Sequence, residues 1–199
     1  MISQIIDTIL SKPPKNGKFY LVAIDGRGGS GKTSFAAQFI ERLPGFTLLN
    51  GDDYFEPTPN GPAWGDFNDE RFSSEVITPL QTGNSFTHRP YDWHSEPHIT
   101  DRLITIEKGL VFERCFSMSL PLDWDCTIWI EAPPDVCLER GLAREILPRE
   151  QVLPVWRDVW QSREDQYIAQ SAPQTSATYV VDGARSIAIR GQNPSRKIR

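Results

Sequence analysis

The chain has 199 residues, of which 39% are hydrophobic and 24% charged, and its formal net charge is −5 at pH 7. This size suits one domain with its own core, and the composition is that of a folded protein rather than a disordered one. No apolar run approaches the roughly 20 residues that a membrane-spanning helix needs. The acidic balance argues against broad nucleic-acid binding. We therefore expect neither membrane nor nucleic acid as a partner.

The amino-terminal segment and the cysteines both favour a reducing, cytoplasmic setting. Residues 1–15 lack the basic start, the long apolar stretch and the small-residue cleavage site of a secretory signal. Cys115, Cys126 and Cys137 form no CxxC pair or His/Cys cluster, so they indicate neither a zinc site nor a disulfide framework. We expect a single domain over residues 1–199.

Short apolar runs alternate with helical patterns along most of the chain. A continuous apolar run suits a strand buried on both faces, and apolar residues three and four apart are typical of a helix. Strand patterns cover residues 19–24, 46–49, 102–107, 109–113, 127–131 and 178–181, and helical patterns cover residues 2–10, 33–43, 135–147 and 154–170. This alternation predicts a three-layer α/β domain, doubly wound around a mainly parallel, five-stranded sheet.

Residues 50–97 differ in character from the rest of the chain. They are rich in Pro, Gly, Asp and aromatic residues and show little periodicity, apart from a short helical pattern over residues 69–78. A loop region this long in a compact domain is more often functional than idle. At the other end, residues 191–199 form a cationic tail after several chain breakers, which we expect to fray.

The strongest motif lies between the first predicted strand and the helix after it. Residues 26–33, Gly-Arg-Gly-Gly-Ser-Gly-Lys-Thr, match the pattern G-x-x-x-x-G-K-[ST]. Glycines let backbone N–H groups approach phosphate oxygens, and the positive end of the helix dipole faces the same anion. In this motif Lys32 reaches the β- and γ-phosphates, and the Thr33 hydroxyl holds Mg²⁺. The predicted nucleotide-binding residues are Gly26, Arg27, Gly28, Gly29, Ser30, Gly31, Lys32, Thr33 and Ser34.

Three further groups of charged residues indicate which class of phosphate-loop protein this chain resembles. Asp52 and Asp53 follow the second predicted strand, at the sheet edge beside the phosphate loop. Glu113 ends an apolar strand, where an acid can serve a metal ion. Arg140 and Arg144 lie one helical turn apart. A small-molecule kinase needs these three things: a carboxylate near the acceptor hydroxyl, an acid for the metal and a cationic lid.

Each of these residues also has a purely structural interpretation. Asp52 suits a turn, Glu113 suits a surface strand end, and Arg140 and Arg144 suit a solvated helix face. Asp25, directly before the loop, more often orders a turn than reacts. The Asn-Lys-x-Asp element of GTPases and the Ser-Gly-Gly-Gln signature of transport ATPases do not occur. The alternative to a kinase is a nucleotide-binding switch or regulatory module without an acceptor.

Taken in order, the motifs resemble those of the uridine kinase-like branch of the P-loop kinases. The resemblance covers roughly residues 19–183. It rests on the phosphate loop, on Asn-Gly-Asp-Asp-Tyr-Phe at residues 50–55, on Arg-Pro-Tyr-Asp-Trp at residues 89–93, on Leu-Val-Phe-Glu at residues 110–113 and on the arginine-rich segment. It implies phosphoryl transfer from ATP, with Mg²⁺, to a hydroxyl of a small molecule.

The resemblance also assigns roles to residues. It places the base at Asp52, with Asp53 as the neighbour that could replace it, and the metal-side acid at Glu113. Arg140 and Arg144 become the lid arginines, which neutralise charge on the transferred group. An acceptor-binding insertion falls at about residues 50–100 and the lid at about residues 135–151. The residues implied at the acceptor are Asp53, Tyr54, Phe55, Tyr91 and Trp93.

The chain departs from the family pattern on the acceptor side. The family usually has Gly after the strand-end Glu, and here Arg114 follows. In the family a histidine follows the Tyr-Asp-aromatic element by a few residues. This chain has no histidine at that place, which lies between His94 and His98. A nucleoside, a pantothenate-like alcohol, a sugar or another metabolite therefore all remain open as acceptors, as does the oligomeric state.

Overall fold

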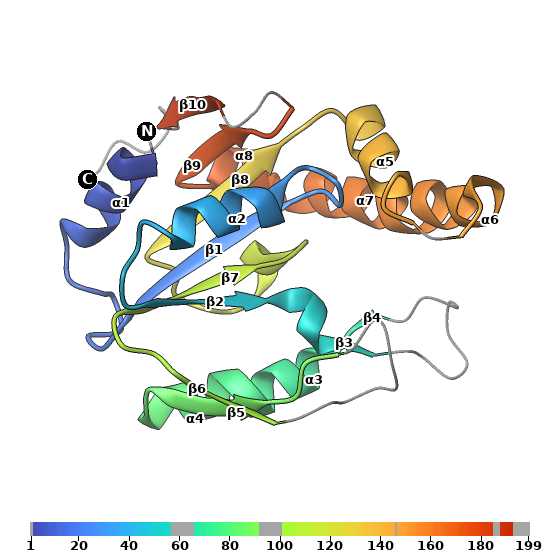
Figure 1. Cartoon of the computed structure of the whole chain (residues 1–199). Coiled ribbons are helices and arrows are strands. Elements are labelled where there is room, and N and C mark those ends of the chain that lie inside the picture. Colours follow the sequence, from blue (N-terminus) through green and yellow to red (C-terminus); the bar gives the residue numbers. More distant parts are fainter. Residues whose placement is uncertain (1, 57–65, 92–100, 146, 185–187, 193–199) are drawn as a thin grey trace.

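The centre of the computed structural model, which describes residues 2–56, 66–91, 101–145, 147–184 and 188–192, is a six-stranded sheet. Its strands are β1 (Tyr20–Gly26), β2 (Phe46–Asn50), β7 (Gly109–Glu113), β8 (Cys126–Glu131), β9 (Tyr179–Asp182) and β10 (Ala188–Gln192). They lie in the order β10-β9-β8-β1-β7-β2 (Figure 1). The strands β1, β2, β7, β8 and β9 are parallel, as predicted. β10 adds an antiparallel edge next to β9.

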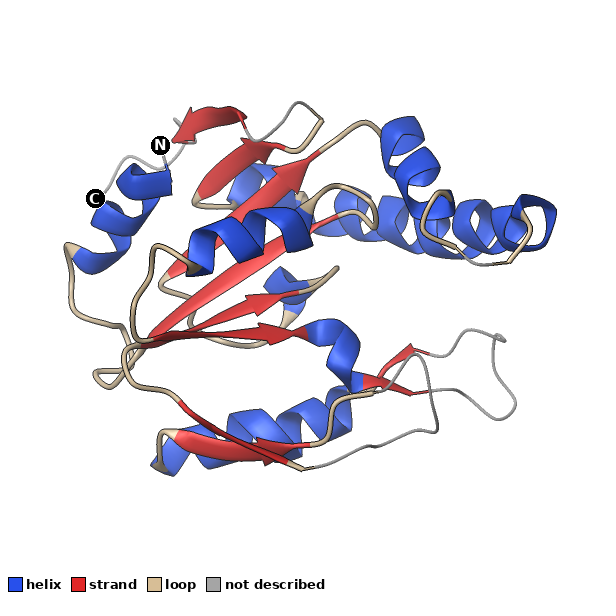
Figure 2. Cartoon of the chain, in the orientation of Figure 1, coloured by secondary structure: helices blue, strands red, loops and turns tan. Residues whose placement is uncertain are grey.

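Helices cover both faces of this sheet (Figure 2). They are α1 (Ile2–Leu10), α2 (Lys32–Ile40), α3 (Asp69–Phe72), α4 (Thr78–Thr82), α5 (Pro134–Leu142), α6 (Arg149–Pro154), α7 (Ser162–Ser171) and α8 (Pro173–Ser176). Two π-helical segments, η2 (Ser73–Ile77) and η4 (Val155–Gln161), join α3 to α4 and α6 to α7, and two 3₁₀ turns are η1 (Gly51–Tyr54) and η3 (Ser117–Ser119). Within the described part of the chain, no helix is both long and apolar enough to cross a bilayer.

Two small antiparallel sheets lie outside the main one. They pair β3 (Phe55–Glu56) with β4 (Asp66–Phe67), and β5 (Ser85–His88) with β6 (Arg102–Thr105). The strand pattern predicted over residues 102–107 is therefore a strand, but it joins this separate hairpin. Its residues are mostly exposed, because the hairpin covers a helical layer instead of lying inside the main sheet.

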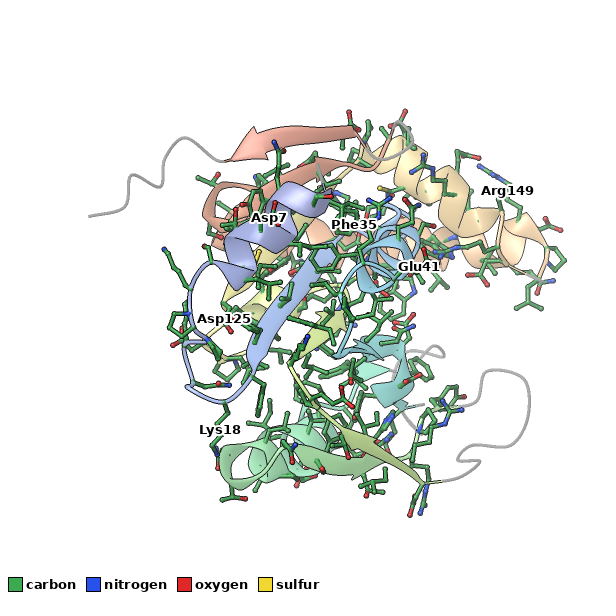
Figure 3. All side chains as sticks on the ribbon, turned by 60° about the vertical axis from the view of Figure 1, so that its left-hand side comes forward. Asp7, Lys18, Phe35, Glu41, Asp125 and Arg149 are labelled. Carbon is green, nitrogen blue, oxygen red and sulfur yellow. The ribbon has the colours of Figure 1, made fainter. Side chains whose placement is uncertain are left out.

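The central strand β1 shows why a buried strand of this sheet appears in the sequence as a continuous apolar run. Val22 and Ile24 point to the core under α1 and α2, whereas Leu21 and Ala23 point to the core on the opposite face. Successive side chains of a strand face opposite sides, so a strand covered on both sides must be apolar throughout. Figure 3 shows Phe35 of α2 in the layer between that helix and the sheet, where it is 1% exposed.

Aromatic rings build the core of the opposite layer. Phe112 of β7 packs on Phe72 of α3 with 4.6 Å between ring centres, and on Trp124 with 6.4 Å. Phe67 and Tyr54 extend the same cluster toward the carboxyl ends of the strands. This cluster fixes the layer formed by α3, η2 and the small hairpins against the sheet.

Several predicted boundaries change in the structure, and the helix predicted over residues 135–147 ends at Leu142 as α5. The helix predicted over residues 154–170 begins earlier, at Arg149, and runs through Pro154 to Ser171 as α6, η4 and α7. The tail predicted to fray from residue 191 begins inside β10, and its residues 193–199 lie outside the described part of the chain.

Truncation of the buried ring of Phe112 tests the packing of the second core. We expect Phe112→Ala to lower the free energy of unfolding by about 3–5 kcal/mol, because it leaves a cavity among rings. The matched control is Leu103→Ala on β6, where the side chain is 73% exposed and the expected change is within about 0.5 kcal/mol. Urea unfolding followed by circular dichroism measures both, and similar losses would contradict this account of the core.

Candidate active site

The candidate site forms where the parallel strands end. β1 pairs with β7 on one side and β8 on the other, and in the register of the sheet Glu113 of β7 lies opposite both Ile24 of β1 and Asn50 of β2. The chain passes from β1 to β2 on one side, and from β7 to β8 on the other side of β1. Ligands of doubly wound sheets bind at such a switch point. The residues that follow Ile24, Asn50 and Glu113 therefore meet at one edge.

The segment after β1 has the backbone of a phosphate loop. Gly29 and Gly31 have φ angles of 77° and 102°, a region that favours glycine. A methyl group at Gly29 would overlap the carbonyl oxygen of Cys137 in α5. The Ser30 N–H donates to the Arg27 carbonyl oxygen over 3.0 Å, which closes the turn, and α2 begins at Lys32. The glycines of the motif are thus required by conformation and by close packing.

The Lys32 ammonium lies inside this loop. Its Nζ donates to the Arg27 carbonyl oxygen over 2.8 Å and to Cys115 Sγ over 3.2 Å. Burial favours a lower pKa for Lys32, but the neighbouring Cys115 and Glu113 outweigh it and raise the pKa above its ordinary value. Burial raises the pKa of the Cys115 thiol to about 12. The site therefore presents a protonated lysine.

Thr33 and Glu113 come together next to Lys32. The Thr33 hydroxyl donates to Glu113 Oε2 over 3.2 Å, and Glu113 is 5% exposed. Burial raises the pKa of Glu113, against the lowering effect of Lys32. In the described ranges no three His, Cys, Asp or Glu side chains gather as a metal cage. A hydroxyl and one carboxylate still fit Mg²⁺, which in phosphate sites relies on one or two protein groups, water and the phosphates.

Asp52 and Asp53 lie in η1, directly after β2. Asn50 Oδ1 accepts from the Asp52 N–H over 3.0 Å, so the Asn50 side chain shapes the turn. Asp52 is exposed, and its charge contributes to the raised pKa of Glu113, which places the two carboxylates at the same edge. Asp53 is half-buried, and burial raises its pKa, while Arg102 and Arg71 oppose the shift.

The aromatic residues predicted at the acceptor fall in different environments. Tyr54 is fully buried in the core of the second layer, where its ring stacks on His88. Phe55 and Tyr91 pack edge to face, with 4.9 Å between ring centres, and both are half-buried. Trp93, like His94 and His98, lies outside the described residues. Of this set, Phe55 and Tyr91 are brought together near the aspartates, because the Tyr91 N–H donates to the Asp53 carbonyl oxygen over 2.9 Å.

The two predicted lid arginines lie on α5 and just after it, and they differ in their contacts. Arg140 donates to the carbonyl oxygens of Gly183 and Ala184 over 2.7 and 3.1 Å. These hydrogen bonds hold the segment after β9. That segment lies against the phosphate loop, since a methyl group at Gly183 would overlap the Ser30 carbonyl oxygen. Arg144 is exposed, and its charge lowers the pKa of Glu113, opposing burial.

Two carboxylates support the loop. Asp25 is fully buried and accepts from the Gly26 N–H over 2.6 Å, which agrees with its interpretation as a residue that orders the turn. Glu164 of α7 accepts from the Gly28 N–H over 2.7 Å. Sequence reasoning missed Glu164 and also Cys115. Glu164 lies in a polar helical stretch, where nothing in the residue pattern separates a buried glutamate from exposed ones.

Comparison with known proteins finds uridine kinases among the relatives in sequence. The chain is 28% identical over 148 residues to the uridine kinase of Saccharomyces cerevisiae, with 65% of this chain matched but only 30% of the yeast protein. It is 25% identical over 196 residues to the uridine kinase of Ureaplasma urealyticum serovar 10, covering 85% of this chain and 91% of that protein. No family model matches the chain.

Solved structures share the fold. A protein described as a possible uridine kinase from Bacillus stearothermophilus superposes with a TM-score of 0.65 at 18% identity, covering 90% of this chain and 96% of that chain. D-glycerate 3-kinase from Cryptococcus neoformans superposes with a TM-score of 0.51 at 12% identity, covering 96% and 99%. Sequence and fold together support a uridine kinase-like branch of the P-loop kinases. These relatives support a small-molecule kinase.

Two glycines with similar backbone angles test whether the phosphate loop depends on close packing. Gly29 and Gly17 have φ angles of 77° and 72°, but an added methyl group at Gly17 has no atom within 4 Å. We expect Gly17→Ala to cost about 1 kcal/mol of stability from backbone strain alone. We expect Gly29→Ala to cost about 1–3 kcal/mol more, because the methyl group has no room, and to abolish ATP binding. Calorimetric unfolding and ATP titration measure both, and equal effects would contradict the packing argument.

Proposed function

We propose that this chain is an ATP- and Mg²⁺-dependent kinase that transfers a phosphoryl group to a hydroxyl of a small molecule, such as a nucleoside or a related metabolite. The observation that carries the proposal is the contact between Thr33 and Glu113 beside the Lys32 ammonium, at the edge where Asp52 also lies. The proposed setting is the cytoplasm, where the free thiols of Cys115, Cys126 and Cys137 would stay reduced.

The phosphate loop suits a triphosphate donor. Gly26 and Gly29 lie so close to the carbonyl oxygens of Ile130 and Cys137 that neither has room for a side chain. Glycine also leaves the backbone N–H groups of such a loop open to phosphate oxygens. The Lys32 ammonium, whose pKa is raised, stays charged and offsets negative charge on the phosphates. Mg²⁺, held from Thr33 and Glu113, would supply charge neutralisation on the phosphate oxygens.

Asp52 is the proposed base. It is exposed, so its carboxylate is accessible to an acceptor hydroxyl, and Asn50 holds the start of its turn. In the proposed step the acceptor oxygen bonds to the γ-phosphorus, its proton passes to Asp52, and the bond to the bridging oxygen of ADP breaks. Arg144 would add positive charge beside the transferred group. Phe55 and Tyr91 are the described aromatic residues proposed to contact the acceptor.

Replacement of each aspartate in turn tests which one is the base. We expect Asp52→Asn to lower the turnover number at least about 100-fold, as loss of a general base does, with ATP affinity within about twofold of wild type. Asp53→Asn is the matched neighbour, and we expect it to lower turnover less than about tenfold. Steady-state kinetics together with ATP titration separates the effects. A large loss in Asp53→Asn alone would move the role to Asp53, and a collapse of ATP binding in Asp52→Asn would remove Asp52 from it.

Release of ADP in the presence of pooled hydroxyl metabolites tests the activity itself. We expect turnover of Mg·ATP to depend on one pool, and we expect Lys32→Ala to lose it because the charge on the phosphates is no longer offset. Division of the active pool identifies the acceptor. Slow ATP hydrolysis that is indifferent to every pool would instead favour the nucleotide-binding switch, and full activity in Lys32→Ala would reject the site.

A further inference from the structure

The helical segment made of α6, η4 and α7 lies against the phosphate loop. Figure 1 shows α6 and α7 continuing one another beside α5. The Trp156 ring in η4 contacts the loop and α5 together, because methyl groups added at Gly28 and Gly141 would lie 3.0 and 2.5 Å from it. About two helical turns later in the chain, Glu164 of α7 accepts a hydrogen bond from the Gly28 N–H. The loop is thus covered by a helix that begins in the predicted lid segment.

Glu164 and Lys32 hold the two ends of the same peptide group. The N–H of Gly28 donates to Glu164 Oε1 over 2.7 Å, and the C=O of that peptide, on Arg27, accepts from Lys32 Nζ over 2.8 Å. In a trans peptide the N–H and C=O point in opposite directions. Glu164 therefore lies at the opposite end of this peptide from Lys32, with Cys115 Sγ 3.9 Å from Glu164 Oε1 and 3.2 Å from Lys32 Nζ. Any rotation of this peptide would break both hydrogen bonds.

The side chain of Arg27 strengthens this connection. Its Nη1 lies 3.5 Å from Glu164 Oε2, and its Nη2 donates to Asp165 Oδ1 over 2.5 Å. The side chains of Arg27 and Glu164 are only 10% and 8% exposed. A buried carboxylate requires an opposite charge and hydrogen-bond donors, and removal of one partner leaves the other uncompensated. Burial raises the pKa of Glu164, and the Gly28 N–H, Lys32 and Arg27 oppose that shift.

We propose that Glu164 is a positioning residue that fixes the Arg27–Gly28 peptide and, through its carbonyl oxygen, the Lys32 ammonium in the geometry that binds the phosphates of ATP. The inference rests on the proposed use of ATP. Glu164 contacts no substrate in this account, because it acts through the Arg27–Gly28 peptide. Its replacement should therefore weaken the affinity for ATP and leave the Michaelis constant for the acceptor unchanged.

The test compares two substitutions at Glu164 with a control on the same helix. We expect Glu164→Ala to raise the dissociation constant for ATP about tenfold, because one hydrogen bond and one buried ion pair are lost. Glu164→Gln keeps an oxygen for the Gly28 N–H, and Asp165 still pairs with Arg27, so we expect it to restore affinity to within about threefold of wild type. Glu150→Ala, at an exposed position of α6, should match wild type. Titration with a fluorescent ATP analogue measures all four proteins, after their unfolding midpoints are compared.

The outcomes separate this inference from the proposed function. If the wild-type chain binds no ATP, the proposed function fails. If wild type binds ATP and Glu164→Ala binds equally well or more tightly, the positioning role is rejected. If Glu164→Ala does not fold, hydrogen exchange of the Gly28 amide decides. Strong protection in wild type and in Glu164→Gln supports the role, and free exchange in wild type overturns it.

Discussion

One buried carboxylate, that of Asp25, connects the segments on which the candidate site depends. It accepts from the N–H groups of Gly26, Phe116 and Met118 over 2.6, 2.9 and 3.0 Å, and from the Tyr167 hydroxyl over 2.8 Å. Burial raises its pKa, and the Met118, Tyr167 and Gly26 donors together with the Lys32 charge oppose that shift, so the group is retained at an energetic cost that these interactions offset. Through Asp25 the phosphate loop, the segment after β7 and helix α7 share one anchor. A shift in any one of them would leave buried donors without an acceptor.

The residues of the proposed phosphate side meet because of strand register, and that is why the sequence predicts which of them lie together. Apolar runs identify β1, β2 and β7, and parallel pairing then brings the residues after Ile24, Asn50 and Glu113 to one edge. No side-chain detail is needed to place Lys32 and Thr33 near Glu113. The local apolar pattern and the sheet topology indicate the same arrangement here, and a fold can be predicted from sequence where the two agree.

Other features depend on packing between segments distant in the chain. Tyr54 and Phe55 are adjacent aromatic residues, and only the 3₁₀ turn decides that Tyr54 enters the core while Phe55 stays half-buried. The spacing of Arg140 to Arg144 predicts a lid arginine. In the structure the Arg140 guanidinium donates to the carbonyl oxygens of Gly183 and Ala184, more than forty residues away in the sequence. The burial of Glu164 cannot be predicted from the sequence either, because it arises only when α7 packs on the phosphate loop. Side-chain roles set by such contacts have no periodic signal.

The acceptor side is held by side chains rather than by register, and Arg114 illustrates the difference. It stands where the resembled family usually has Gly, and its N–H donates to the Ile24 carbonyl oxygen over 3.1 Å, so the backbone pairing of β7 with β1 extends past Glu113. Its guanidinium carbon lies 3.4 Å from the centre of the Phe67 ring, and its aliphatic carbons leave no room for a side chain at Gly51. A glycine would leave that face of Phe67 without this cover. Because Glu113 is fixed by the backbone of β7, a residue next to it can reshape the proposed acceptor side without disturbing the phosphate side. The proposed acceptor therefore has to be found by experiment, whereas the residues of the proposed phosphate side are brought together by the sheet.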